Sequence, residues 1–404
     1  MAIRKNRLSN LHPNFEVLAS PAGFMLSDKT GSDPTIGYEL LRLISEAFSV
    51  RFHAITSKVD IDKPLPKTVS VYEAHVSNNL LGHAIFILKY YVTGKSVIRR
   101  EKINIIHHIT FHYGANFNPL AMENKHIPFV IGPAYYDPPL PARLVKELTE
   151  ERTHSFSDRM PGKALKYANS IITSLSIKTI KRADAIIAVN NATRNAYARL
   201  TDSKKIKVIP IGVRTEDFKP TAPPKNSDIL IPAALIKARG VKYAIKAMPK
   251  ILKEHREAKL HVVGDGPEKP FLQRLCKQLN IESSVVFHGR LPHKSMNGIF
   301  KSCRLVVLPS ILQSFGNVLL EAMASGRPVV ATEALGPREI VVDGETGYVV
   351  PIADSDALAE AISRLLSDYE LCCKMGIKGR KLVEDKYSWH VVAEQYYRVY
   401  RSLA

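Results

Sequence analysis

Residues 308–332 carry the groups of this chain best suited to bind a phosphorylated ligand, and they read LPSILQSFGNVLLEAMASGRPVVAT. The pattern predicts a strand, a loop with Phe315 and Gly316, a helix that begins near Asn317, and a second strand. The first N–H groups of a helix, here those at 316–319 and so including Val318, are expected to have no acceptor inside it. They can therefore hold the oxygens of a diphosphate.

Two polar side chains flank this helix start: Gln313 precedes it, and Glu321 stands eight residues later, about one turn inside the helix. A carboxylate at Glu321 is placed to accept hydrogen bonds from two ribose hydroxyls. The alternative is a solvated helix carboxylate. A second glycine turn, with Gly264 and Gly266 between a predicted strand and a predicted helix, suits either a nucleotide or a tight connection.

Three histidines, His107, His108 and His112, lie near the end of another predicted strand, in the segment IHHITFHYG. His108 can bind or help to activate a polar ligand, because imidazole both donates and accepts protons near neutral pH. A structural role is the alternative, and a metal site is the less favoured one. The acid pair in ADSDA (353–357) is expected to cap a helix, so we expect no metal requirement.

The composition limits the classes of protein and partner. The chain has 404 residues, enough for two or three domains, and an ordinary apolar content of 45%. A net charge of +19 favours nucleic acid, acidic lipid or phosphorylated substrates. No apolar run reaches membrane-spanning length, and the start does not resemble a secretory signal. Four cysteines without metal-ligand spacing suggest a reduced, cytoplasmic environment.

Strands and helices alternate along most of the sequence, which predicts parallel sheets with crossover helices. The alternation restarts after the proline-rich segment 214–228, which is the expected linker. We predict an α/β protein with two doubly wound, Rossmann-like domains facing a cleft: an N-terminal domain in 1–212, a C-terminal domain in 213–385, and an amphipathic helix in 386–404. Ligands are expected at the carboxyl ends of the strands.

Several segments resemble the retaining glycosyltransferases often called family 4, which have the two-domain GT-B architecture. The resemblance is densest in residues 205–350 and rests on KIKVIPIGVRTEDFKP, LHVVGDGPEKPFLQRL, VVFHGRLPHKSM, SFGNVLLEAMASGRPVVAT and GPREIVVDGETGYVVP. It implies a nucleoside-diphosphate-sugar donor in the C-terminal domain and an acceptor held mainly by the N-terminal domain. It also implies that the last helix, with YSWHVVAEQYY, crosses back onto the N-terminal domain.

The signature of this family is two glutamates eight residues apart, and only the second is present here. By the resemblance, Glu321 holds the ribose and Gln313 contacts the transferred sugar. Glutamine keeps an acceptor oxygen and an NH₂ donor, but it gives less electrostatic help to an oxocarbenium-like transition state.

The expected phosphate clamp departs from the family pattern as well. Where the family has Gly-Arg-Leu and then Lys-Gly, positions 233–235 read Ala-Ala-Leu, and Arg239-Gly240 follow. The resemblance places Arg239 and Gly240 at the diphosphate, with Lys237 as a second cation in place of the missing arginine. A solvated loop lysine is the alternative for Lys237.

The N-terminal half departs more strongly. TIGYELLRLI resembles the family's glycine-rich start of the first helix, with Gly37 kept and Ile36 where a second glycine is common. Gly37 would bring the backbone close to the donor phosphate or the acceptor. Tyr135-Tyr136 stand where a subgroup has glycines, so we expect a reshaped acceptor side. Glu39 and Asp137 are the only acids considered there as a nucleophile.

Together these features predict transfer of a hexose from a nucleoside-diphosphate sugar to a hydroxyl of a glycan or lipid-linked acceptor, with retention at the anomeric carbon. Gln313, Arg239 and His108 are the expected catalytic residues. The alternative is a degenerate member, changed at Ala234, Gln313 and Tyr135-Tyr136, that binds a sugar nucleotide or glycan as a partner subunit.

Charge and family resemblance also predict an anionic membrane surface as a partner, on the cytoplasmic face. Basic residues surround an apolar stripe on the predicted helix at 163–182, and family members often use lipid-linked acceptors. The alternative for this helix is that the stripe packs on the domain's own sheet and the lysines are only solvated. Nucleic acid is not an expected partner, because only the net charge points to it.

Overall fold

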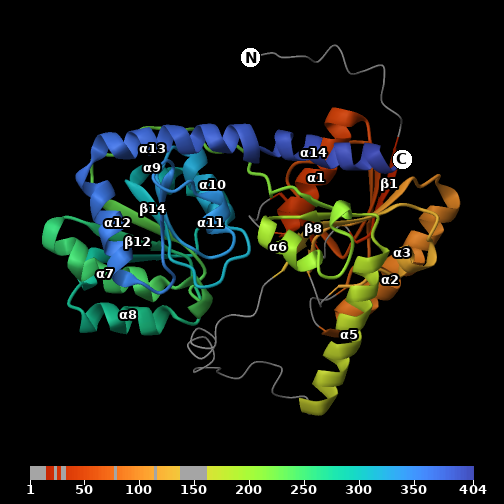
Figure 1. Ribbon diagram of the computed structural model, residues 1–404, viewed down its shortest axis with the longest axis horizontal. Helices are drawn as coiled ribbons and strands as arrows, with labels where there is room; N and C mark the ends of the chain where they lie inside the picture. The colour runs from red at the N-terminus through yellow and green to blue at the C-terminus, as the bar shows by residue number, and fades with distance from the viewer. Residues whose placement is uncertain (1–14, 22–24, 29–32, 77–79, 113–115, 137–161) are drawn as a thin grey trace. The chain divides into compact units, whose positions relative to one another are not determined.

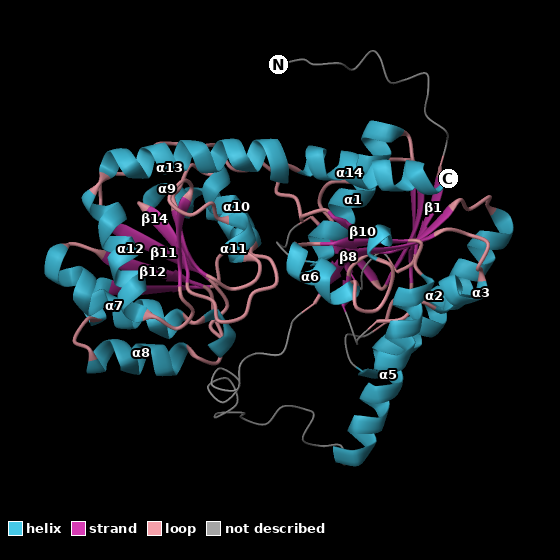
Figure 2. Ribbon diagram, viewed as in Figure 1, coloured by secondary structure: helices cyan, strands magenta, loops and turns pink. Residues whose placement is uncertain are grey.

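The computed structural model describes residues 15–21, 25–28, 33–76, 80–112, 116–136 and 162–404. These residues form two compact units, coloured along the chain in Figure 1. Unit 1 contains the described residues up to Tyr136, those from 162 to Gly212, and the C-terminal stretch from Trp389. Unit 2 contains Val213–Ser388. Each unit is a parallel sheet covered by helices (Figure 2).

The unit 1 sheet runs in the order β10-β9-β8-β6-β1-β3-β5, with β7 paired to β8 and every described pair parallel. The order turns back between β1 and β6, and ligands of doubly wound sheets bind at the carboxyl ends beside such a reversal. The strands are β1 (Glu16–Ala19), β3 (Arg51–Thr56), β5 (Val69–Glu73), β6 (Ile105–His108), β7 (Phe111–His112), β8 (Phe129–Tyr135), β9 (Ala185–Ala188) and β10 (Ile206–Val208), with a separate pair β2 (Met25–Ser27) and β4 (Lys58–Asp60).

The C-terminal helix α14 (Trp389–Leu403) completes the core of unit 1. Its Tyr397 ring stacks on Phe48 at the end of α1, with 4.2 Å between the ring centroids. The Tyr400 hydroxyl donates to Nδ1 of His107 at 2.7 Å, and Nε2 of His107 donates to the Gly132 carbonyl at 2.7 Å. The expected return of the last helix is thereby confirmed. The helices before it in this unit are α1 (Asp33–Phe48), α2 (Leu80–Arg100), α3 (Pro119–Glu123), α5 (Gly162–Arg182) and α6 (Asn191–Tyr197).

The unit 2 sheet runs in the order β13-β12-β11-β14-β15-β16 and turns back between β11 and β14. Its central strands are apolar runs buried on both faces, as expected where helices cover a parallel sheet. The prediction of two Rossmann-like α/β units is confirmed. The strands are β11 (Asp228–Pro232), β12 (Lys259–Val263), β13 (Val285–Gly289), β14 (Leu305–Leu308), β15 (Val329–Thr332) and β16 (Gly347–Val350), and the helices are α7 (Val241–Glu254), α8 (Lys269–Gln278), α9 (Met296–Ser302), α10 (Asn317–Ala324), α11 (Pro337–Ile340), α12 (Ser355–Ser367) and α13 (Tyr369–Leu382).

The proline-rich segment 214–228 is packed on unit 2 and is not a free linker. Phe218 is only 2% exposed. Its carbonyl accepts a hydrogen bond from the Arg380 guanidinium at 2.5 Å, and the Thr221 carbonyl accepts one from Arg327 at 3.0 Å. The low apolar content suggested a linker, but one buried ring and these carbonyl contacts hold the segment in place.

Candidate functional site

Two loops meet at the reversal point of the unit 2 sheet, and both carry predicted site residues. After β11, a 3-10 turn spans Lys237–Arg239; after β14, the loop leads to Gln313. The Arg239 guanidinium donates to the Leu312 carbonyl at 2.6 Å. The Ala238 carbonyl accepts from the N–H groups of Ile311 at 2.9 Å and Leu312 at 3.1 Å. The structure therefore brings the predicted clamp beside Gln313.

Two glycines allow close contact between the backbones of these loops. Gly240 has φ +61°, and a Cβ there would lie 2.0 Å from the Pro309 carbonyl oxygen. Gly264 has φ +144°, and its Cβ would lie 1.9 Å from the Ala233 carbonyl oxygen. Both glycines therefore have a packing reason for having no side chain. Their contact with a nucleotide stays a prediction.

The start of α10 presents hydrogen-bond donors as the sequence predicts. Gly316, with φ 121°, caps the helix, and its carbonyl accepts the Leu319 N–H at 2.9 Å. Among the described residues, no acceptor is found for the N–H groups of Gly316, Asn317 and Val318. Phe315 is buried at 5% exposure and anchors the loop. These donors suit an anion at a helix start.

Gln313 stands partly buried just before this helix. Its carbonyl accepts the Gly336 N–H at 3.0 Å, so the backbone of the loop is fixed at this residue. Its side-chain amide makes no hydrogen bond to another described residue. The amide is therefore available to a ligand as one acceptor and two N–H donors.

Glu321 is nearly buried, and His293 holds its carboxylate. Nε2 of His293 lies 3.1 Å from Oε1 of Glu321, and the two side chains are 25% and 10% exposed. The His293 ring also meets the edge of Phe218, with centroids 6.0 Å apart. The hydrogen bond to Glu321 raises the pKa of His293 above its ordinary value. The sequence analysis missed His293, although it stands in the quoted segment VVFHGRLPHKSM.

The His293–Glu321 pair predicts a pH-dependent stability. The pKa of His293 is raised in the folded state. The pair therefore contributes fully to the free energy of unfolding below the unfolded-state pKa of about 6.5, and this contribution is lost as pH rises through the folded-state pKa. We expect His293→Gln to lower the free energy of unfolding by about 1 kcal/mol at pH 5.5 and by less at pH 8.5. Urea unfolding of both proteins across this range measures it, and a difference that does not change with pH would contradict the pairing.

His108 lies at the carboxyl end of β6 in unit 1 and is 2% exposed. Burial lowers its pKa to about 3, and His107 and His112 add to the effect, so the ring is neutral near pH 7. Its Nδ1 lies 3.4 Å from the Asn118 amide, and Nε2 has no partner among the described residues. His108 can offer a neutral hydrogen-bonding nitrogen, but a general-acid role is not favoured.

The other N-terminal residues singled out from the sequence have structural contacts. Gly37 is buried inside α1, one turn from its first residue. Glu39, considered as a loop-end acid, lies within the same helix at 0% exposure and pairs with Arg42 at 2.7 Å. Tyr135 stacks on His112, with centroids 4.8 Å apart. Asp137 lies outside the described residues.

Two further expectations can be compared with the contacts. Asp354 caps α12 by accepting the Ala357 N–H at 2.9 Å, as expected for the acid pair at 353–357. In the described part of the chain, the group of three side chains that could hold a metal ion lies elsewhere in unit 1. No described helix is both long and apolar enough to cross a bilayer.

Two family models match the chain. "Glycosyl transferases group 1" matches residues 213–382, and "Glycosyltransferase Family 4" matches residues 50–217. An uncharacterized glycosyltransferase of Methanocaldococcus jannaschii is 38% identical over 173 residues, 43% of this chain and 44% of that protein. A GDP-mannose-dependent alpha-(1-6)-phosphatidylinositol monomannoside mannosyltransferase of Mycolicibacterium smegmatis is 30% identical over 226 residues, 51% of this chain and 59% of that protein.

The fold has solved counterparts. The sucrose-phosphate synthase structure from Thermosynechococcus elongatus matches with a TM-score of 0.72 and 20% identity, over 97% of this chain and 99% of that one. The chain spans roughly half the length of the curated relatives it matches. The two family models fall on successive halves of the sequence and meet at the boundary between the units. The chain therefore belongs to the group 1, family 4 glycosyltransferases and has their GT-B fold.

Proposed function

We propose that this chain transfers a hexose from a nucleoside-diphosphate sugar to a hydroxyl of a glycan or lipid-linked acceptor, with retention at the anomeric carbon. The observation that carries the proposal is the start of α10, where three N–H groups lack described acceptors and Glu321 is held by His293. Diphosphate oxygens suit the N–H groups, and ribose hydroxyls suit the carboxylate. The nucleotide would lie at the reversal point of the unit 2 sheet.

In this proposal the predicted site residues have separate roles. Arg239, with Lys237 beside it, neutralises the charge that develops on the leaving diphosphate. The Gln313 amide binds hydroxyls of the transferred sugar, and the neutral His108 ring binds the sugar or the acceptor. Gly37 and Tyr135 belong to the acceptor side. The chemistry needs no metal, since donors and cations orient the diphosphate.

A panel of nucleoside diphosphates and their sugars, read by thermal unfolding, tests the proposal. A ligand that binds only the folded state raises the unfolding temperature by mass action. We expect one base to stabilise the chain through both its diphosphate and its sugar form, and the sugar form to be consumed when an acceptor is added. Stabilisation without turnover would favour a partner subunit that binds the sugar nucleotide, as the substitution at Gln313 allows. If no nucleotide stabilises the chain, both the transferase proposal and the partner-subunit alternative are overturned.

We also propose that the chain binds an anionic membrane surface from the cytoplasmic side, where a lipid-linked acceptor would lie. On α2, Ile85, Leu88 and Val92 are 39%, 63% and 59% exposed along one face. The same face continues into a hollow lined by Val92, Lys95, Ser96, Arg99 and Arg100. An apolar stripe beside basic residues suits a lipid headgroup region.

The basic helix singled out from the sequence contributes less to this surface than its charge suggests. Lys178 and Lys181 of α5 are exposed, but Arg182 pairs with Asp184 at 2.8 Å and donates to the Ile127 carbonyl at 2.9 Å. The side chains at 163–169 lie outside the described residues. Both α2 and α5 contact α3 (Figure 1), so their exposed residues belong to one part of unit 1.

Liposome sedimentation tests the membrane proposal. At low salt we expect binding to anionic but not neutral vesicles, and release at ~0.5 M salt, where the screening length falls to a few Å. Leu88→Ser with Val92→Ser should reduce binding severalfold through loss of apolar burial. Ile377→Ser, which removes a 72% exposed apolar residue of unit 2, is the matched control. No sedimentation with anionic vesicles at low salt would remove the proposal.

A further inference from the structure

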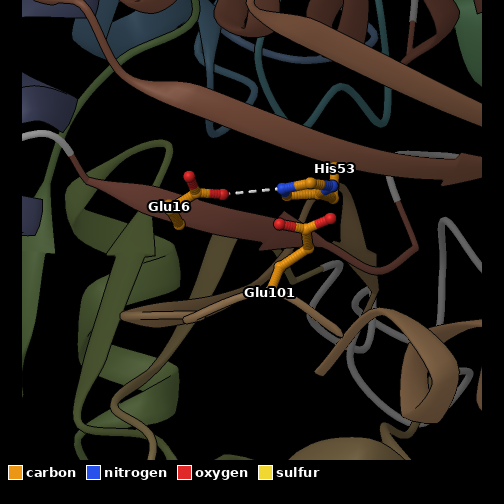
Figure 3. Close-up of side chains that lie close together, drawn as sticks. All are labelled: Glu16, His53 and Glu101. Carbon is orange, nitrogen blue, oxygen red and sulfur yellow. Dashed lines mark hydrogen bonds and ion pairs between the residues drawn. The ribbon is translucent and has the colours of Figure 1, made fainter. Parts of the chain in front are cut away.

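Three metal-ligating side chains converge at the amino edge of the unit 1 sheet (Figure 3). Glu16 opens β1, His53 lies in β3, and Glu101 stands between α2 and β6. One ligand atom of each residue lies within 4.8 Å of the other two. In the described part of the chain this is the only group of three His, Cys, Asp or Glu side chains so arranged.

The backbone fixes the three residues relative to one another. Strands β1 and β3 pair in parallel with Glu16 opposite Arg51, so Glu16 and His53 point from the same face. The loop that carries Glu101 is tied to the same strand, because the Asn104 N–H donates to the Glu16 carbonyl and the Asn104 side chain accepts the Glu16 N–H, both at 2.9 Å. The ligands therefore come from three segments held as one unit.

The His53 ring is placed as a metal-binding imidazole would be. It is 3% exposed, with Nδ1 3.3 Å from the Tyr72 hydroxyl and Nε2 2.7 Å from Oε2 of Glu16. If Nδ1 carries the proton and donates a hydrogen bond to the Tyr72 hydroxyl, the lone pair on Nε2 faces the carboxylates. A partner on the second ring nitrogen that fixes the tautomer is a usual feature of metal-bound histidine.

The charges of the cluster are not balanced by the described contacts. Oε1 of Glu16 pairs with Arg51 at 2.6 Å. The Glu101 carboxylate makes no ion pair or hydrogen bond to any described residue. Two carboxylates this close repel each other unless a cation or a proton lies between them. Arg51 already pairs with Oε1 of Glu16. Oε2 of Glu16, Nε2 of His53 and the Glu101 carboxylate therefore remain as ligands for a cation between the carboxylates.

We propose that Glu16, His53 and Glu101 bind a divalent transition-metal ion, with Zn²⁺ as the best match. One imidazole and two carboxylates are ligands that Zn²⁺ accepts, and a water completes four-coordination. To bind the ion, Glu16 exchanges its hydrogen bond with His53 for a bond to the metal. The site lies at the opposite ends of the strands from His108, so the ion would hold β1, β3 and the loop before β6 together and would take no part in sugar transfer.

Thermal unfolding of the full chain, freed of metal by a chelator and titrated with ZnCl₂, tests the site. At a hundredfold excess over Kd we expect the unfolding temperature to rise by about 3–6 °C, and equilibrium dialysis to find one tightly held zinc per chain. MgCl₂ should have little effect, because Mg²⁺ prefers an all-oxygen octahedral site. Glu101→Gln, which breaks no described contact of the folded chain, should abolish the zinc-dependent rise.

A matched control distinguishes this site from other histidines. In unit 2, Nδ1 of His261 lies 3.0 Å from Nε2 of His288, so this pair is a second place where imidazole nitrogens could bind zinc. His261→Gln should leave the zinc response intact. No rise with zinc in the native chain would overturn the proposal. An equal rise in Glu101→Gln, or a loss in His261→Gln instead, would also overturn it.

Discussion

Replacing Arg239 by alanine is expected to lower sugar transfer by tens- to a hundredfold. A hydrogen-bonded charge removed from a diphosphate costs ~2–3 kcal/mol, because the departing phosphate then lacks the cation that neutralises it. Ala234 stands where the family has an arginine, so Lys237 is the second cation expected at the clamp. Steady-state kinetics on the best donor, with calorimetric nucleotide affinity, measures the loss.

Arg239 also fixes the loop before α10 through its 2.6 Å bond to the Leu312 carbonyl, and two variants separate the roles. Arg239→Gln can still donate to that carbonyl but has no charge, so it should resemble Arg239→Ala if charge dominates. Lys246→Ala removes an exposed cation from neighbouring α7 and should leave the rate unchanged. Nucleotide affinity within twofold of the native value in Arg239→Ala, or full activity in Arg239→Gln, would count against the clamp.

Replacing Glu321 by alanine is expected to weaken nucleoside-diphosphate binding by roughly tenfold or more, and to do so more than Gln313→Ala does. Two ribose hydroxyls donating to one carboxylate contribute about 1.5–3 kcal/mol each at most, and the loss is shared by donor and product. Gln313 would contact only the sugar, so its variant should change donor affinity and spare the free diphosphate. Calorimetry of the native chain and both variants with both ligands gives the six affinities required.

A nucleotide without ribose hydroxyls makes this test sharper. A 2′,3′-dideoxynucleoside diphosphate should bind native chain and Glu321→Ala with equal affinity, because the hydroxyls and the carboxylate are the two halves of one interaction. Glu333→Ala, at an exposed position just after β15, controls for a general loss of negative charge. Equal affinity of the native chain and Glu321→Ala for the ordinary diphosphate would refute the ribose assignment.

The sequence predicted the fold class and the strands that carry the site because these are strong local signals. Strands such as β11 and β14 are continuous apolar runs, and glycines mark the loops that follow them. The sequence analysis did not identify β5 as a strand. Its residues are only partly buried or exposed at the edge of the sheet, so no apolar run marks it.

Contacts between distant segments could not be predicted in this way. The His293–Glu321 pair joins residues 28 positions apart, and the Glu16–His53–Glu101 cluster joins three segments of unit 1. Each member alone is an ordinary charged or polar residue. The segment 214–228 shows the opposite error, because its prolines indicated a linker while its single buried ring, Phe218, and its carbonyls attach it to unit 2.

The position of α14 has a consequence for biosynthesis. Tyr396 and Tyr400 belong to the buried interior of unit 1, yet the ribosome makes them after all of unit 2. The described part of unit 2, Val213–Ser388, is one continuous stretch, so it can fold as soon as it leaves the exit tunnel. Until α14 is synthesised, the surface of unit 1 that this helix covers stays exposed to solvent. We expect chaperones to protect this nascent surface until α14 has left the ribosome.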